Sequence, residues 1–242
     1  MRIIAVIPAR FGSKRFRGKP LVKIAGKTMI EWVYNRVESA QVFDQIIVAT
    51  DDPRIDKEVK RFGAESVMTS VDHPSGTDRI WEVIRNMEID AVVNIQGDEP
   101  LISIDLIQEI YSELKHGQCP VVTAVFQNNS LKDFNSTNIV KATMNCSGEA
   151  LYFSRSPIPN VNYSEFTGFL HHVGIYGYTK NALNMFVSHG CSDLENKEKL
   201  EQLRFIENGY KIKLIHTDYL SVGVDVPSDV DLVEKRLREE NA

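Results

Sequence analysis

The chain has 242 residues, of which 43% are hydrophobic and 25% charged, and its formal net charge at pH 7 is −5. This length suits a single domain that buries a sizeable core without disulfide or metal staples. The negative charge argues against general affinity for nucleic acid, and no apolar run approaches the length that a membrane span requires. Three widely spaced cysteines, Cys119, Cys146 and Cys191, fit no metal motif and predict a reducing, cytoplasmic compartment.

A strand followed by a basic loop opens the chain. Ile3 to Ile7 is a continuous apolar run, which predicts a strand buried on both faces of a parallel sheet. We expect Pro8 to end this strand, because proline has no amide hydrogen for the sheet ladder. This early start leaves no room for a signal peptide. The loop then carries five cations and two glycines: Arg10, Gly12, Lys14, Arg15, Arg17, Gly18 and Lys19.

The position of this loop predicts a site for a polyphosphate. Open α/β sheets bind ligands beyond the carboxyl ends of their strands, and glycines let the backbone approach a phosphate closely. The loop is not a Walker A motif, because Gly12 and Gly18 enclose five residues and Pro20 follows Lys19. No G-x-G-x-x-G dinucleotide fingerprint occurs either. A solvated basic surface loop is the plainer alternative.

Strand and helix patterns alternate along the rest of the chain. The apolar spacing predicts helices at residues 29–40, 53–62, 79–87, 104–115, 195–208 and 227–239. Strands are expected at residues 45–50, 65–68, 90–95, 120–126, 139–144, 150–153, 171–178 and 211–217. This alternation predicts an α/β fold with a mostly parallel sheet and right-handed crossovers.

Candidate site residues stand where predicted elements begin or end. Ser75 to Thr77 precede a helix, where hydroxyls and free amides bind a base or ribose, although a helix cap at Thr77 or Asp78 explains them as well. Asp98 follows an apolar strand, and Asp225 stands at a second element end. Two such carboxylates suit Mg²⁺ against a triphosphate, while a turn-forming Gly-Asp pair is the simpler explanation of Asp98.

Polar side chains of the second half suit a polyhydroxylated acid. They are Tyr152, Arg155, His171, His172, Tyr176, Tyr178, Glu201, Gln202 and Arg204. Each also has a structural explanation: the tyrosines as core aromatics, the histidines as satisfied polar groups, and Glu201 with Arg204 as an i,i+3 helix pair. The residues alone do not decide between a ligand-binding role and a structural role for these side chains.

The loop from Pro8 to Leu21 resembles the signature loop of the sugar-nucleotide cytidylyltransferases. Further motifs, in order along the chain, are similar to the 3-deoxy-manno-octulosonate cytidylyltransferase family. They are residues 49–51, 75–79, 94–100, 150–155, 172–177, 200–204 and 223–225. No single motif is decisive, but the ordered set is specific.

The resemblance implies a Rossmann-like nucleotidyltransferase fold, with a mostly parallel central sheet flanked by helices. It implies one domain with a CTP-binding half (1–127), a smaller sugar-binding and dimerisation lobe (128–220), and a return to the core with a C-terminal helix (221–242). The implied reaction transfers the cytidylyl group of CTP to the anomeric hydroxyl of 3-deoxy-D-manno-octulosonate (Kdo) and releases pyrophosphate. The implied protein is a Mg²⁺-dependent homodimer that serves lipopolysaccharide biosynthesis.

The resemblance also implies a role for individual residues. The catalytic set is Lys19, Asp98, Asp225 and Arg15, and the metal ligands are Asp98 and Asp225. CTP is expected on Arg10, Ser13, Arg15, Lys19, Ser75, Gly76 and Thr77. Kdo is expected on Gln96, Arg155, His172, Tyr176, Glu201 and Gln202. One departure is Arg17, where the family usually has proline, and we expect it to loosen the loop and add a charge.

Alternatives remain at this stage. The nearest is a cytidylyltransferase for 8-amino-Kdo or another ulosonic acid such as a sialic acid. A non-catalytic nucleotide-binding protein is disfavoured because both candidate metal aspartates are present. A Rossmann oxidoreductase is disfavoured because the dinucleotide fingerprint is missing.

Overall fold

The structure is a computed structural model that describes residues 1–12, 15–161, 166–219 and 222–240. Its helices are η1 (Lys19–Leu21), α1 (Met29–Ser39), α2 (Pro53–Arg61), α3 (Gly76–Ile84), α4 (Ile104–His116), α5 (Leu131–Phe134), α6 (Lys180–Ser188), α7 (Asp193–Glu198), α8 (Leu203–Glu207) and α9 (Asp229–Glu240). Its strands are β1 (Ile3–Ala9), β2 (Lys23–Ile24), β3 (Lys27–Thr28), β4 (Ile46–Thr50), β5 (Glu65–Met68), β6 (Ala91–Asn94), β7 (Val121–Asn128), β8 (Lys141–Met144), β9 (Ala150–Ser154), β10 (Phe169–Thr179) and β11 (Ile212–Thr217).

The central sheet is mostly parallel, as the sequence predicted. Its strands lie in the order β11-β7-β10-β6-β1-β4-β5, and β10 alone in this path runs antiparallel to its neighbours. The chain leaves β1 for β4 and β5 on one side and then returns to β6 on the other. This reversal of strand order beside β1 opens a crevice at the carboxyl ends of the strands, where such sheets bind ligands.

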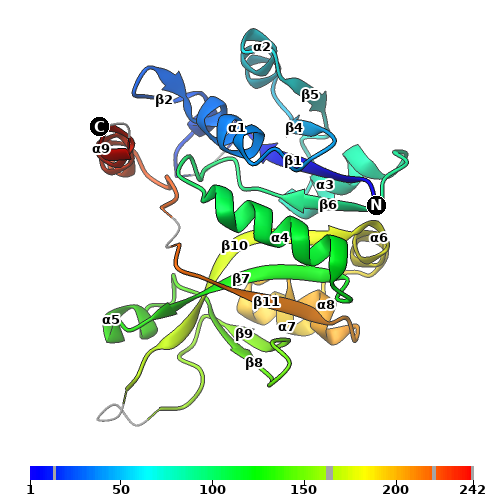
Figure 1. Cartoon of the computed structure of the whole chain (residues 1–242), viewed down its shortest axis with the longest axis vertical. Coiled ribbons are helices and arrows are strands. Elements are labelled where there is room, and N and C mark those ends of the chain that lie inside the picture. Colours follow the sequence, from blue (N-terminus) through cyan, green and yellow to red (C-terminus); the bar gives the residue numbers. More distant parts are fainter. Residues whose placement is uncertain (13–14, 162–165, 220–221, 241–242) are drawn as a thin grey trace.

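Helices cover both faces of this sheet (Figure 1). Alternate residues of β1 belong to opposite cores: Ile3, Ala5 and Ile7 pack with α1 and α4, whereas Ile4 and Val6 pack with α3 and α6. All five side chains are fully buried. The apolar run without alternation is therefore explained, because a strand covered on both faces has no side exposed to solvent.

The first strand is longer than expected, because it continues through Pro8 to Ala9. Pro8 pairs in register with Ala49 of β4, while pairing with β6 ends at Val6 opposite Asn94. The carbonyl of Val6 accepts from the amide of Ile95, so the backbone N and C=O groups of Val6 face β6. Pro8 stands two residues further along the strand, and its backbone N therefore faces the same side. The missing amide hydrogen of Pro8 thus faces a point beyond the end of β6, where no ladder bond is lost.

The prediction of one helix over residues 195–208 is wrong, because Lys199 interrupts it. Lys199 ends α7 in a left-handed conformation with φ 57° and ψ 45°, and α8 begins only at Leu203. The intervening turn carries Glu201 and Gln202. Helix α6 was not predicted; its first turn is capped by Thr179, whose hydroxyl accepts from the amide of Ala182 at 3.2 Å.

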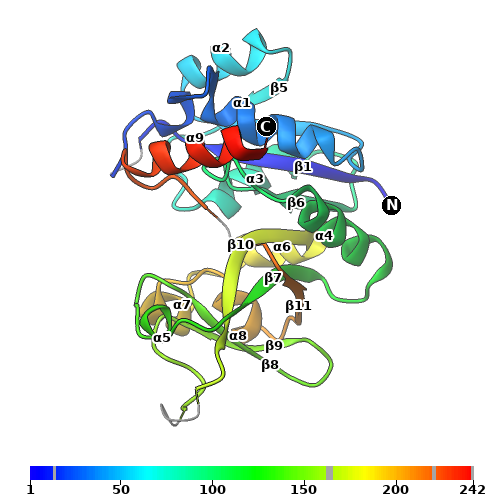
Figure 2. The ribbon, with the colours of Figure 1, turned by 60° about the vertical axis from the view of Figure 1, so that its left-hand side comes forward.

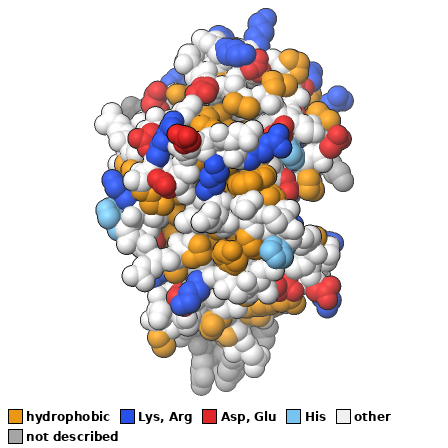
Figure 3. Space-filling view, turned by 90° about the vertical axis from the view of Figure 1, so that its right-hand side faces the viewer, with side chains coloured by type: hydrophobic (Ala, Val, Ile, Leu, Met, Phe, Trp, Pro, Cys, Tyr) orange, Lys and Arg blue, Asp and Glu red, His pale blue; other side chains and the backbone are white. Residues whose placement is uncertain are grey.

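The C-terminal segment returns to the N-terminal half. Helix α9 lies beside β2 and α1 (Figures 1 and 2), and Val233 and Leu237 join a small apolar cluster with Ile24 and Met29. The hairpin of β8 and β9 extends at the opposite end, joined to the sheet through β10 (Figure 1). On the face shown in Figure 3, charges of both signs are interspersed.

Candidate active site

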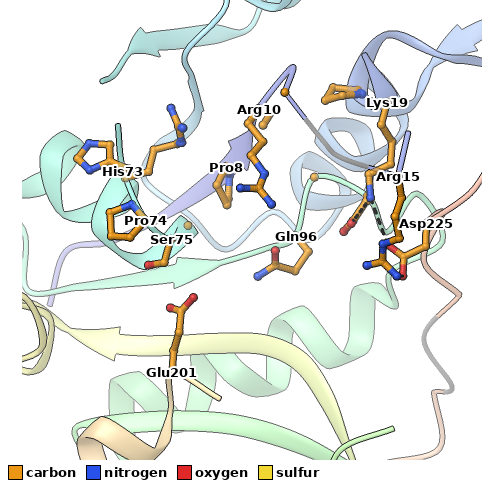
Figure 4. Close-up of a pocket in the computed structure, with 17 residues that line it drawn as sticks. Pro8, Arg10, Arg15, Lys19, His73, Pro74, Ser75, Gln96, Glu201 and Asp225 are labelled. Carbon is orange, nitrogen blue, oxygen red and sulfur yellow. Dashed lines mark hydrogen bonds and ion pairs between the residues drawn. The ribbon is translucent and has the colours of Figure 1, made fainter. Parts of the chain in front are cut away.

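A cavity of about 540 Å³ lies at the carboxyl ends of β1 and β6. Residues of the basic loop and of the segment at Ser75 and Gly76 line it. Figure 4 shows these side chains converging from separate segments of the chain. Lys19, Arg15 and Asp225 stand at one end, whereas His73 and Ser75 stand at the other (Figure 4). The members are Pro8, Ala9, Arg10, Gly12, Arg15, Lys19, Pro20, His73, Pro74, Ser75, Gly76, Arg79, Gln96, Gly97, Asp98, Glu201 and Asp225.

Two carboxylates and two cations meet at one end of this cavity. The ammonium of the buried Lys19 donates to Asp98 Oδ2 at 2.5 Å and lies 3.6 Å from Asp225 Oδ1. The guanidinium of Arg15 lies 3.2 Å from Asp225 Oδ2. Both predicted metal ligands and two of the predicted triphosphate ligands are therefore neighbours, although Asp98 and Asp225 are far apart in sequence. Arg10 adds a further cation to the lining.

Close backbone packing brings Asp98 to this place. A Cβ atom on Gly97 would lie 2.7 Å from the carbonyl oxygen of Pro8, so the chain after β6 passes β1 at a distance that only glycine permits. The backbone amide of Val224 donates to the carbonyl of Asp98 at 2.9 Å. This bond fixes the segment of Asp225 beside the end of β6.

Phe11 and Asp51 anchor the basic loop. The amide of Phe11 donates to Asp51 Oδ1 at 3.2 Å, and its carbonyl accepts from the amide of Gly18 at 2.9 Å. The buried Arg79 donates to Asp51 Oδ2 at 2.9 Å, which ties the loop to α3. Arg54 stacks 3.5 Å from the Phe11 ring centroid, and Arg17 lies 5.8 Å from it. Arg17, the departure from the family pattern, thus contacts an aromatic ring of the loop.

The opposite end of the cavity is the N-terminus of α3. Ser75 caps this helix, because its hydroxyl accepts from the amide of Asp78 at 3.2 Å. The alternative explanation, a helix cap at Thr77 or Asp78, is therefore wrong. Instead, the hydroxyl of Thr77 donates to Glu201 Oε2 at 2.8 Å. This bond joins the two walls of the cleft across 124 residues of sequence.

A smaller cavity of about 220 Å³ adjoins the first one, and Gly76, Gln96 and Glu201 line both. Its other walls include Thr77, Asn94, Tyr176, Tyr178 and Gln202. Burial raises the pKa of the Glu201 carboxyl, although hydrogen bonds from Thr77 and Ser75 oppose the shift. The predicted Kdo ligands Gln96, Tyr176, Glu201 and Gln202 therefore all line the smaller cavity.

Arg155 and His172, the other predicted Kdo ligands, line neither cavity. Arg155 donates through Nε to the carbonyl of Glu198 at 3.1 Å and through a terminal nitrogen to the carbonyl of Thr137 at 3.2 Å. The His172 ring lies 3.0 Å from the hydroxyl of Thr123, and burial lowers its pKa to about 3, with His171 adding to the shift. His172 is therefore neutral at physiological pH. Ser13, a predicted CTP ligand, lies outside the described residues.

Some site residues received no role from the sequence. Arg79 and Asn94 lie inside motifs that carried the family resemblance, yet only the structure shows that Arg79 holds Asp51 and that Asn94 lines the smaller cavity. Tyr178, which the sequence offered either as a ligand of a polyhydroxylated acid or as a core aromatic, is buried and also lines that cavity. No group of three or more metal-ligating side chains occurs among the described residues. In the same part of the chain, no helix has the length and apolar character needed to span a membrane.

The comparisons with known proteins match this chain to a class of transferases. The cytidylyltransferase family model matches residues 4–212, and the chain belongs to that family of nucleotidyltransferase enzymes. Within it, the chain is one of the 3-deoxy-manno-octulosonate cytidylyltransferases. Relatives of that name are 45% identical in Geotalea daltonii, over 99% of both chains, and 46% identical in Syntrophobacter fumaroxidans, over 96% of both.

Solved structures agree with this assignment. The structure of CMP:2-keto-3-deoxy-manno-octonic acid synthetase complexed with CTP has a TM-score of 0.94 and 38% identity, covering 99% of this chain and 100% of that one. A 4-diphosphocytidyl-2C-methyl-D-erythritol synthase from Anaerococcus prevotii has a TM-score of 0.66 and 13% identity, covering 98% of each chain. The second likeness shows the fold alone. Together they confirm the predicted nucleotidyltransferase fold.

Proposed function

We propose that this protein transfers the cytidylyl group of CTP to the anomeric hydroxyl of Kdo, giving CMP-Kdo and pyrophosphate. The observation that carries the proposal is the cleft itself. A cavity with a cationic end adjoins a smaller polar cavity, in a chain related over its whole length to enzymes named for this reaction. The larger cavity suits CTP and the smaller one suits the sugar acid.

The proposed chemistry is a direct in-line displacement. The anomeric hydroxyl attacks the α-phosphorus and loses its proton to water, a P–O bond forms, and the bond between the α-phosphorus and the leaving pyrophosphate breaks. Positioning and charge neutralisation supply most of the acceleration in such transfers. Arg10, Arg15 and Lys19 would hold the triphosphate and offset the charge that develops on the leaving pyrophosphate. Ser75 and Gly76 would receive the cytosine at the other end of the cavity.

Mg²⁺ is the proposed cofactor, held by Asp98 and Asp225. The donor set fits this ion, because both carboxylates lie within 4 Å of one ammonium nitrogen and so already converge on a positive charge. When bound there, Mg²⁺ would lower the pKa of the attacking hydroxyl and offset charge on the phosphates. Substrate oxygens and water would complete its coordination.

Replacing one metal ligand tests this assignment. We expect Asp98→Asn to lower turnover by about 100-fold or more, because one of the two carboxylates that would hold Mg²⁺ against the reacting groups is lost. Asp105→Asn, an exposed aspartate of α4, is the matched control and should retain full activity. Activity of Asp98→Asn within a few-fold of wild type at saturating Mg²⁺ would exclude the metal role.

We also propose a cytoplasmic homodimer that serves lipopolysaccharide biosynthesis. Within the described residues β9 pairs only with β8, and Leu151 on β9 is 57% exposed, so this edge offers an apolar strand to a second copy. The cytoplasmic assignment rests on three unpaired cysteines. Sedimentation of the wild type and of Leu151→Lys tests the dimer.

Pyrophosphate release tests the reaction. The assay contains CTP and Mg²⁺ with Kdo, 8-amino-Kdo or a sialic acid as acceptor. We expect Kdo to give the highest kcat/KM. A higher kcat/KM with 8-amino-Kdo would favour the related alternative, and no release with any of the three would contradict the proposal.

A further inference from the structure

Two buried polar atoms of the smaller cavity have no hydrogen-bond partner. They are Asn94 Oδ1 and Gln202 Nε2, on side chains that are 2% and 5% exposed. Both residues line the smaller cavity. Buried polar atoms of folded proteins are nearly always paired, so an acceptor and a donor left open in one cavity indicate a ligand that pairs with both.

The position of Asn94 in the sheet determines where its unpartnered Oδ1 lies. Asn94 is the last residue of β6 and pairs in register with Tyr176 of β10. Burial raises the pKa of the Tyr178 hydroxyl, and the side chains of Asn94 and Thr77 have a smaller and opposite effect. Because Oδ1 has no partner, the amide nitrogen is the group of Asn94 that can donate toward this hydroxyl. The oxygen is therefore held as a free acceptor.

The chemistry of the cavity selects a polyol. A hydroxyl group both donates and accepts, so neighbouring hydroxyls satisfy an open acceptor and an open donor together. A carboxylate only accepts and would leave Asn94 Oδ1 unpaired. The stacked rings of Tyr176 and Tyr178, with centroids 5.5 Å apart, add an apolar wall for the carbon chain.

We propose that Asn94 is a specificity-determining residue, which accepts a hydrogen bond from one hydroxyl of the acceptor sugar acid while Gln202 donates to another. This inference rests on the proposed function and deepens it. The smaller cavity takes the hydroxylated chain of the acceptor, and the reacting anomeric end faces the larger cavity through the shared wall at Gln96 and Glu201.

Asn94→Leu removes the acceptor while keeping the side-chain volume. We expect kcat/KM for Kdo to fall about 10-fold, because the hydroxyl then enters a buried site without its partner. The KM for CTP should stay within about 2-fold of wild type. Gln202→Met is the second variant, and its kcat/KM for Kdo should fall by about the same factor. It tests the inference if Asn94→Leu does not fold. A rise in the KM for CTP in place of that for Kdo would overturn the inference.

Kdo analogues that each lack one hydroxyl sharpen the test. Wild type should lose about 10-fold in kcat/KM with the analogue that lacks the contacted hydroxyl. Asn94→Leu should use that analogue as well as Kdo, because the contact is already gone. If wild type is indifferent to every missing hydroxyl, or both variants discriminate as wild type does, the inference is wrong. Wild type that releases no pyrophosphate with Kdo instead contradicts the proposed function itself.

Discussion

The ammonium of Lys19 donates to the carboxylate of Asp98 at 2.5 Å, across 79 residues of sequence, and reaches Asp225 at 3.6 Å. The two carboxylates proposed to hold Mg²⁺ are thus already neutralised in part by a side chain of the chain itself. Two cations cannot share one pair of carboxylates without repulsion. Lys19 should therefore oppose metal binding until a triphosphate offers it another anionic partner.

Lys19→Met tests this competition. We expect Mn²⁺, used as a probe for Mg²⁺, to bind the nucleotide-free variant more tightly than wild type, because the competing charge is gone. Turnover should fall about 100-fold or more, since a cation facing the leaving pyrophosphate is lost. Electron paramagnetic resonance titration measures the Mn²⁺ affinity, and pyrophosphate release measures turnover.

Lys23→Met is the matched control, because Lys23 is an exposed cation of the neighbouring strand β2. It should leave both Mn²⁺ affinity and turnover unchanged. Equal Mn²⁺ affinity in wild type and Lys19→Met would show that the Lys19 contacts do not limit metal access.

Local patterns predicted most of the elements, because burial on both faces leaves a clear sequence signal. Strand β5 has the expected ends, and α4 starts at the expected Ile104. The errors arose where a neighbour decides the outcome. Pro8 stays in β1 because β6 ends before it, and the left-handed Lys199 that splits the helix predicted over residues 195–208 has no signature in the sequence.

The site was predictable where it depends on strand ends. Asp98 follows β6 and Lys19 follows the loop after β1, and parallel strands end at one edge of the sheet, as the sequence pattern indicates. Asp225 instead precedes α9 and is held beside Asp98 by the backbone bond from Val224. The positions of Arg155 and Asn94 depend instead on tertiary packing. Arg155 binds backbone carbonyls near the β8–β9 hairpin, and the open atom of Asn94 is recognisable only when all its neighbours are known.

Gly18 is expected to be essential for the shape of the basic loop. It adopts φ +74°, and a Cβ atom there would lie 3.0 Å from the Phe11 ring. Gly18→Ala should lower the free energy of unfolding by about 1–2 kcal/mol, because L-residues are disfavoured in the left-handed region. Urea unfolding measures this loss.

Gly12→Ala is the control for this substitution. Gly12 belongs to the same loop, but nothing lies within 4 Å of its would-be Cβ atom. Its unfolding free energy should change little. Equal losses in the two variants would mean that the strain argued for Gly18 does not determine the stability of the loop.

His172 predicts a loss of stability in acid. Burial lowers its pKa to about 3, from 6.5 for an ordinary histidine. Between these two pKa values the unfolded chain is protonated at this residue, whereas the folded protein is not. Between those pKa values, the free energy of unfolding falls as the pH falls. In His172→Gln this part of the acid loss should be absent, while His116→Gln, an exposed histidine of α4, should behave as wild type. Urea unfolding from about pH 7 to about pH 4 measures the difference. Parallel curves for wild type and His172→Gln would contradict the argument.

Glu201 predicts a pH dependence of opposite sign. Burial raises the pKa of its carboxyl above the ordinary 4.5, so the folded protein holds this proton more tightly than the unfolded chain does. As the pH rises from 4.5 through the raised pKa, the folded state must ionise a buried acid, and its stability falls. Glu201→Gln keeps an acceptor for the Thr77 hydroxyl and cannot ionise.

The free energy of unfolding of Glu201→Gln should therefore rise relative to that of wild type as the pH rises, and this gain should vanish below the ordinary pKa. Glu109→Gln, an exposed glutamate of α4, is the control for the loss of a charge. Urea unfolding measures the free energy of unfolding of each protein across this pH range. If the difference between wild type and Glu201→Gln is the same at every pH, ionisation of the Glu201 carboxyl does not destabilise the folded state, and the argument is wrong.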